Sequence, residues 1–252
     1  MKYIFENDKI TFRCDCGKLN YSQRNNEFRW VHPKNPKLKM DADSMCNVTS
    51  IVMALDYAGY QFPKGKFRQP EDNLCDFIFT DKRVMQKYRE WMPAMAAAFE
   101  RGDDNAYCPN LIHTLNVFAT NLWMGTSCLS FKENNTISDI CKEVINNRPV
   151  ILSGTYPFTW ASGATGTLGH INVIAGAVYD KSFMDNLDKM YDLRPIHFII
   201  DDPYGDYRNN FRSTSIMNDI PMPYADFIKL QKPVNNVAIK WAYFVKPGAA
   251  TI

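Results

Sequence analysis

Three segments of the sequence carry the side-chain types that nucleophilic catalysis requires. Cys46 begins the stretch CNVTSIVMALDY, His170 directly precedes INVIAGAVYD, and Asp201 and Asp202 follow HFII. A thiolate nucleophile, an imidazole that moves a proton and a carboxylate that orients the imidazole form a working catalytic set. The sequence therefore contains the parts of a cysteine hydrolase, if the fold brings these side chains together.

Cys46 is predicted to lie in the first turn of a helix over residues 46–58, which Gly59 ends. Asp43 or Ser44 can cap the start of this helix. Unpaired N–H groups and the positive end of the helix dipole favour a thiolate in that position. The alternative is a buried structural cysteine, which is what most free cysteines are. The buried face is indicated by apolar residues at helical spacing, namely Val48, Ile51, Val52 and Leu55.

His170 is predicted to open a strand over residues 170–180, just after the glycine-rich stretch SGATGTLG. If this strand pairs antiparallel with a strand over 196–202, its start lies beside Asp201 and Asp202. Periodicity does not choose between the two aspartates, because a one-residue change of register exchanges their faces. The alternatives are an ordinary polar histidine and a polar turn at DDPYGD.

Two parts with different periodicity must position these residues. Helical patterns cover 46–58, 82–100 with a break at Pro93, 109–121 and 137–147. Strand patterns follow in PVILSGTY, HINVIAGAVYD, HFIIDDP and VAIKWAYFVK, with a short helix around 224–231. We therefore predict one α+β domain over residues 1–252, with a helical part at about 46–147 packed on an antiparallel sheet at about 149–252. The cleft between the parts is the expected site.

Charge, hydropathy and cysteine spacing argue against a nucleic-acid-binding protein, a membrane-spanning protein and a metal-binding protein. Lys and Arg total 29 against 27 Asp and Glu, so the net charge of +2 gives no field that would attract nucleic acid. No window predicts a signal peptide or a membrane span, and we expect synthesis in the cytoplasm. The seven irregularly spaced cysteines indicate reduced thiols. Cys14 and Cys16 have only His32 as a nearby further ligand, so we expect no metal and no other cofactor.

A family resemblance rests on these same segments. CNVTSIVMALDYAGY resembles the nucleophile helix of papain-like cysteine peptidases related to the double-glycine-leader, bacteriocin-processing peptidases. GHINVIAGAVYD and FIIDDPYG resemble the histidine and aspartate segments of that group, and NYSQRNN resembles the segment that supplies its oxyanion-hole glutamine. The resemblance implies a papain-like fold with Cys46 as nucleophile, His170 as base and acid, Asp202 as orienter and Gln23 as oxyanion donor.

The resemblance also implies a substrate. Many relatives carry glycine after the cysteine, whereas Asn47 is typical of a branch that resembles phage and prophage endolysins, which cut the peptide part of bacterial peptidoglycan. We therefore expect a monomer that acts on the cell wall after release. Asn47, Tyr156 and Trp160 are the predicted substrate contacts, the last two in the loop TYPFTWASGATGTLG. The alternative for that loop is a flexible surface segment whose aromatic side chains pack inward.

Two other functions stay open from the sequence. A papain-like site can act on proteins or isopeptides, or transfer acyl groups, and a panel of protein substrates would separate this activity from wall cleavage. The fold can also serve as a non-catalytic interaction module. A Cys46 that is unreactive toward iodoacetamide near neutral pH would favour such a module.

Overall fold

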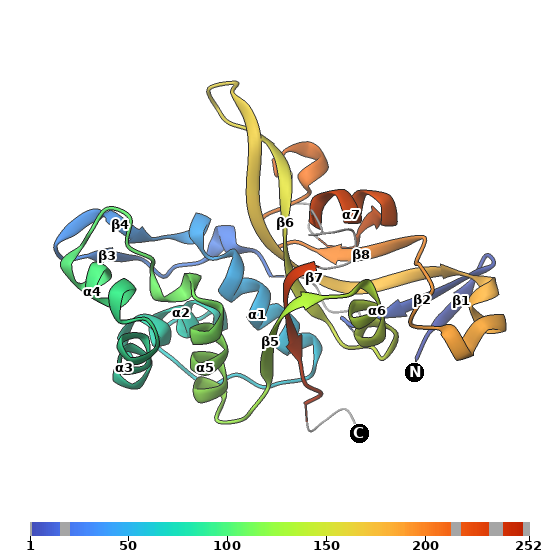
Figure 1. Ribbon diagram of the computed structural model, residues 1–252, viewed down its shortest axis with the longest axis horizontal. Helices are drawn as coiled ribbons and strands as arrows, with labels where there is room; N and C mark the ends of the chain where they lie inside the picture. Colours follow the sequence, from blue (N-terminus) through green and yellow to red (C-terminus); the bar gives the residue numbers. More distant parts are fainter. Residues whose placement is uncertain (1, 16–20, 213–217, 232–238, 249–252) are drawn as a thin grey trace.

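The computed structural model describes residues 2–15, 21–212, 218–231 and 239–248, and Cys16 lies outside these ranges. Its architecture is α+β, which confirms the predicted fold class (Figure 1). A lobe of helices occupies one side of the molecule, an antiparallel sheet occupies the other, and the helix that begins with Cys46 lies between them. The two kinds of secondary structure thus meet at the predicted nucleophile.

The sheet is built around β7. Its strands run in the order β1-β2-β7-β6-β10-β5, with β8 paired to β7 and β9 paired to β8, and all these pairings are antiparallel. The strands are β1 (Ile4–Glu6), β2 (Lys9–Arg13), β5 (Leu129–Asn135), β6 (Val150–Thr159), β7 (Thr165–Asp180), β8 (His197–Asp201), β9 (Ile220–Pro223) and β10 (Ile239–Val245). The first two residues of the predicted last strand, 237 and 238, lie outside the described residues.

The helical lobe contains most of the remaining elements. The α-helices are α1 (Cys46–Tyr57), α2 (Pro70–Thr80), α3 (Lys82–Trp91), α4 (Pro93–Arg101), α5 (His113–Met124), α6 (Ile137–Ile145) and α7 (Tyr224–Gln231). A hairpin of β3 (Trp30–His32) and β4 (Asn35–Met40) lies beside α4 at the edge of this lobe (Figure 1). The 3-10 helices are η1 (Gln23–Asn25), η2 (Ala42–Ser44), η3 (Pro109–Leu111), η4 (Lys181–Lys189) and η5 (Tyr207–Asn209).

Both faces of the sheet are covered, because alternate residues of β7 enter two different apolar clusters. Val173 packs with α1 and the helical lobe, whereas Ile174 packs with residues of α6, α7 and η4. The hydroxyl of Ser50 on α1 donates to the backbone carbonyl of Ile171, 3.2 Å away. These contacts fix α1 against the strand that carries His170.

The predicted helices at 46–58, 137–147 and 224–231 are confirmed to within a few residues, and Pro93 splits the 82–100 pattern into α3 and α4. The division into a helical part and a β part is too simple, however. β5 lies inside the predicted helical part and pairs with β10 across a long stretch of sequence. α2 and the strands before Cys46 were not predicted, because they are short or lack a regular apolar period.

The β6–β7 hairpin corrects the predicted loop around TYPFTWASGATGTLG. Its strands stay paired from Val150↔Ile174 out to Thr159↔Thr165, and in Figure 1 the hairpin projects away from the body of the molecule. Gly163, in the turn, has a positive φ of 84°, whereas Gly166 and Gly169 have ordinary strand conformations. The glycine-rich stretch therefore continues the strand, and His170 lies within β7 rather than at its start.

Candidate active site

Cys46 is the first residue of α1 and is partly exposed. The residue before the helix is Met45, and no side chain caps the helix start. The predicted cap by Asp43 or Ser44 is therefore wrong, and the Ser44 hydroxyl instead lies 3.3 Å from the Asp41 carboxylate. The backbone N–H groups of the first turn are consequently not occupied by a capping side chain, and they can stabilise negative charge on sulfur or on a substrate oxygen.

Other cysteines in the described part of the chain have a different environment. Burial raises the pKa of Cys75 well above its usual value and raises that of Cys108. It also raises the pKa values of Cys128 and Cys141 to about 11. These four side chains remain thiols at neutral pH, so their reactivity is low.

His170 and Asp202 form a buried pair. His170 Nε2 lies 2.7 Å from Asp202 Oδ1, and the two side chains are 3% and 1% exposed. The same carboxylate oxygen accepts the backbone N–H of Tyr204 at 2.8 Å and that of Gly205 at 3.1 Å. The turn that follows Asp202 therefore fixes the carboxylate, and the carboxylate fixes the imidazole.

Cys46 completes this arrangement. Burial by itself lowers the pKa of His170, but the charge and hydrogen bond of Asp202, followed by a side-chain hydrogen bond and charge interaction with Cys46, raise it to about 10. Because Nε2 faces Asp202, Nδ1 is the ring nitrogen left for the thiol. The site favours an imidazolium beside the sulfur, which is the protonation state in which a thiolate is stabilised.

Aromatic rings surround His170. The centroids of Tyr156, Tyr204 and Phe211 lie 6.0, 5.9 and 5.3 Å from that of the imidazole. Tyr156 was predicted to contact substrate, but it is wholly buried and its hydroxyl accepts the side-chain N–H of Asn172. Its position corrects that prediction, because it packs beside the histidine, where it limits the access of water.

The structure also corrects the predicted substrate contact at Asn47. This residue is 2% exposed, and its side-chain N–H donates to the backbone carbonyl of Asn110 at 2.9 Å. The Asn116 side chain donates to the same carbonyl at 2.7 Å. Asn47 therefore ties the start of α1 to η3 in the helical lobe, and its buried side chain is not exposed to a substrate.

Trp160 is 43% exposed and lies beyond the end of β6, at the tip of the hairpin. It is six residues further along the chain than Gly154, which pairs with His170. At about 3.3 Å per strand residue, this separation is roughly 20 Å. Trp160 therefore lies far from the reacting groups, and its contact with a long substrate stays a prediction.

Gln23 links the segments that carry Asp202 and Cys46. Its backbone N–H donates to the Pro203 carbonyl at 2.9 Å, directly after Asp202. Its buried side-chain amide donates to the carbonyls of Ala42 at 3.0 Å and Asp43 at 3.2 Å, in the 3-10 turn that leads to Cys46. The structure thus brings Gln23 to the predicted site, with its amide nitrogen held by the segment before the nucleophile.

Arg24 was missed by the sequence reasoning, although it directly follows Gln23. Its Nε donates to the Tyr204 carbonyl at 2.9 Å and its Nη2 to the Phe211 carbonyl at 2.5 Å. Its guanidinium also lies 4.0 Å from the centre of the Tyr204 ring. One side chain therefore joins two of the aromatic residues that surround His170.

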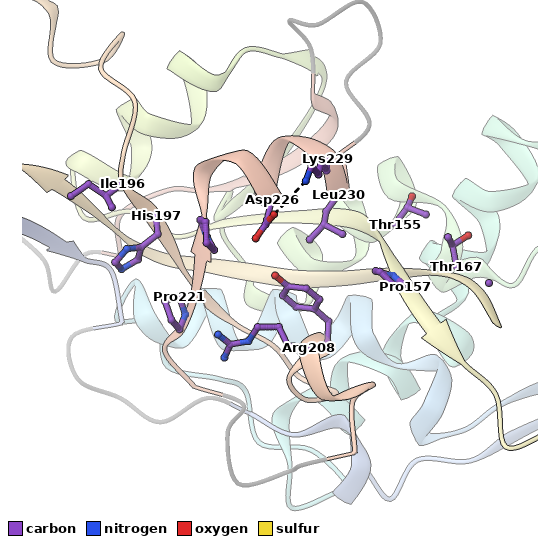
Figure 2. A pocket seen from close by; sticks show the side chains of 13 residues that line it. Thr155, Pro157, Thr167, Ile196, His197, Arg208, Pro221, Asp226, Lys229 and Leu230 are labelled. Atoms are coloured by element: carbon purple, nitrogen blue, oxygen red, sulfur yellow. Dashed lines mark ion pairs between the residues drawn. The ribbon is translucent and has the colours of Figure 1, made fainter. Parts of the chain in front are cut away.

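A cavity of about 760 Å³ lies on the β side of the molecule (Figure 2). Its walls come from α7, η5, the β6–β7 hairpin, β8 and β9, and none of Cys46, His170 and Asp202 lines it. Within the described ranges, no group of three or more His, Cys, Asp or Glu residues could hold a metal ion. None of the described helices is long and apolar enough to cross a membrane.

A comparison with protein-family models identifies the family of the chain. The model of a family described as the Peptidase_C39 like family matches residues 20–226, a range that includes Gln23, Cys46, His170 and Asp202. A search of curated proteins gives no match.

Proposed function

The chain belongs to the Peptidase_C39 like family, a family of cysteine peptidases, and from this premise we propose that it cleaves the peptide part of bacterial peptidoglycan through Cys46, His170 and Asp202. The contact of His170 with both other side chains is the observation that carries the proposed chemistry. The proposed substrate rests on the resemblance of CNVTSIVMALDYAGY to the phage and prophage branch.

In this mechanism the Cys46 thiolate attacks the carbonyl carbon of an amide, and the His170 imidazolium gives its proton to the leaving nitrogen. The C–N bond breaks, an amine departs and a thioester remains on Cys46. Neutral His170 then takes a proton from water, and the resulting hydroxide attacks the thioester. The C–S bond breaks, a carboxylic acid leaves and the thiolate–imidazolium pair is restored.

Asp202 orients the imidazole throughout this cycle and stabilises its positive charge whenever His170 is protonated. The oxyanion would accept the backbone N–H of Cys46, with the Gln23 side chain as a second donor. The carbonyls of Ala42 and Asp43 are neighbours in one turn, so a single Gln23 N–H can serve both in a three-centre bond. The other amide hydrogen is then available to the oxyanion.

Digestion of purified peptidoglycan by the wild type and by Cys46→Ala tests this proposal. We expect new amino groups with the wild type only, and fragment masses that identify the bond. If neither protein releases amines while the wild type cleaves members of a protein substrate panel, the peptidoglycan assignment is wrong and the thiol chemistry is retained. If wild type and Cys46→Ala release amines equally, the role of Cys46 is wrong.

A further inference from the structure

A smaller cavity opens directly beside His170. It has a volume of about 290 Å³, and Gly169, which precedes His170, and Gly154, which pairs with His170 across the hairpin, both line it. Further lining residues are Ser153 and Thr155 on β6 and Lys240 and Trp241 on β10. A group bound here would lie against the backbone at Gly169 and Gly154, the residue before His170 and its partner across the hairpin.

The sheet topology explains why this space exists. β10 pairs with β6 only as far as Ala242↔Leu152, whereas it stays paired with β5 out to Ile239↔Asn135. β6 and β10 therefore separate after Leu152, and residues 153–155 face residues 240–241 across a gap. The cavity is a consequence of the strand pairing rather than of one side-chain rotamer.

Two glycines line the side of the cavity near His170. A Cβ atom at Gly154 would lie 2.7 Å from the Tyr156 ring, so a side chain there would disturb the packing beside His170. A Cβ at Gly169 would meet no atom within 4 Å. Backbone is consequently exposed at Gly169, where a substrate chain can approach closely.

The cavity is lined by one positively charged side chain and by two side chains with hydroxyl groups. Lys240 is its one charged lining residue in the described part of the chain, and within those residues no acidic side chain forms an ion pair with it. Ser153 and Thr155 add hydroxyl groups that can donate hydrogen bonds. An ammonium group that forms no ion pair with a described acidic side chain, together with hydroxyl donors, is suited to a carboxylate.

Lys240 also acts on its surroundings electrostatically. Burial lowers the pKa of His113 to about 4, and the positive charge of Lys240 contributes to that decrease. His113 lies against Trp241, with 4.1 Å between the ring centroids. His113 is therefore neutral at physiological pH, and it does not compete with Lys240 for an anion.

We propose that this cavity binds a free carboxylate carried by the substrate peptide next to the cleaved bond, with Lys240 as its partner. The inference rests on the proposed function and specifies its substrate class: a peptide with an acidic branch close to the scissile amide. Thr155 and Leu230 line both this cavity and the larger one of Figure 2, so the two spaces adjoin. The remainder of a long substrate has room to continue there.

The test measures binding separately from hydrolysis. The full chain with Cys46→Ala is titrated by calorimetry with two synthetic wall peptides that differ only at isoglutamate, one with a free carboxylate and its twin with a carboxamide. We expect the carboxylate peptide to bind about tenfold more tightly, and the difference to shrink as salt is added. Adding Lys240→Ala should reduce the ratio to about one, and Lys240→Glu should reverse the preference. Lys189→Ala, a change at an exposed lysine on η4, should leave the ratio unchanged.

Equal affinities, a preference that survives Lys240→Ala, or failure of both peptides to bind would overturn the inference. The wild-type chain is then given the same peptides, and released amines are counted. A carboxylate preference that depends on Lys240, without any cleavage, would refute the proposed function and leave the carboxylate site in place. Cleavage of both peptides at equal rates, with equal binding, would retain the peptidase and remove the site.

Discussion

His170 Nε2 lies 2.7 Å from Asp202 Oδ1, and the carboxylate accepts two backbone N–H groups from the turn that follows it. The negative charge of Asp202 raises the pKa of His170 against the effect of burial. We therefore expect Asp202→Asn to lower this pKa and to reduce kcat roughly 100-fold, because the imidazole loses its orientation and its charge partner.

The pH profile of kcat/KM checks this expectation. Activity requires the His170 proton, so the wild-type profile should fall on the alkaline side near pH 10, where His170 loses it. In Asp202→Asn the alkaline limb should move to lower pH. An alkaline limb at the same pH in both proteins would show that Asp202 does not set the protonation of His170.

Arg24 is expected to position the histidine through the turn that follows Asp202. Arg24→Ala removes hydrogen bonds to the carbonyls of Tyr204 and Phe211, and with them the contact between the guanidinium and the Tyr204 ring. We expect kcat to fall about tenfold with little change in KM, and the alkaline limb to shift as in Asp202→Asn. Arg24→Lys should restore part of the activity.

The control for this prediction is Arg89→Ala, which removes an exposed arginine paired with Glu100 in the helical lobe. It should leave the pH profile and kcat unchanged. If Arg24→Ala lowers only the melting temperature, with kcat and the pH profile as in the wild type, Arg24 has a structural role and does not position the histidine.

Asn47 is expected to affect stability more than substrate binding. Its buried amide donates to the Asn110 carbonyl and connects α1 to η3. Asn47→Ala leaves that carbonyl with fewer donors, so the free energy of unfolding should fall by about 1 to 3 kcal/mol. Urea denaturation measures this loss, and KM should stay within about twofold. A large rise in KM with unchanged stability would show instead that Asn47 contacts substrate.

Asp201 predicts a pH dependence of stability. Burial raises its pKa to about 7 although Tyr57 donates to it at 2.7 Å, and the usual value for an unfolded chain is about 3.9. A raised folded-state pKa means that the protonated form stabilises the fold. The contribution is complete below about pH 4 and is lost as the pH rises through 7, by up to about 4 kcal/mol.

Denaturation of the wild type and Asp201→Asn at several pH values isolates this effect. The free energy of unfolding of the wild type minus that of the variant should decrease from pH 4 to pH 7, because the asparagine cannot ionise. A difference that stays constant over this range would contradict the raised pKa. Asp219 and Asp15, whose charges also raise this pKa, remain in both proteins.

The sequence alone predicted the elements whose apolar residues have a regular spacing, and the strand pairs that are neighbours along the chain. The helical spacing from Val48 to Leu55 predicted α1, and antiparallel pairing of the segments after His170 and before Asp202 predicted the neighbourhood of these two residues. The choice between Asp201 and Asp202 needed coordinates. In the fold, Asp201 lies on β8 and meets Tyr57, whereas Asp202 follows the strand end and meets His170.

Features that depend on tertiary contacts were missed. Glycines at 166 and 169 suggest a loop, yet pairing with β6 holds them in a strand. Aromatic residues beside a histidine suggest a substrate wall, yet the inward direction of Tyr156 follows from its position in the hairpin. Arg24 has no sequence signal of its own, because its partners are backbone carbonyls about 180 residues away.

The rate of alkylation of Cys46 by iodoacetamide, followed by mass spectrometry at pH 6 in the wild type and in His170→Ala, is the most direct test of the proposed nucleophile. We expect Cys46 to react at least about tenfold faster than any other cysteine in the wild type and to lose this advantage in His170→Ala. A Cys46 that reacts no faster than the buried cysteines, and at the same rate with and without His170, would contradict the account.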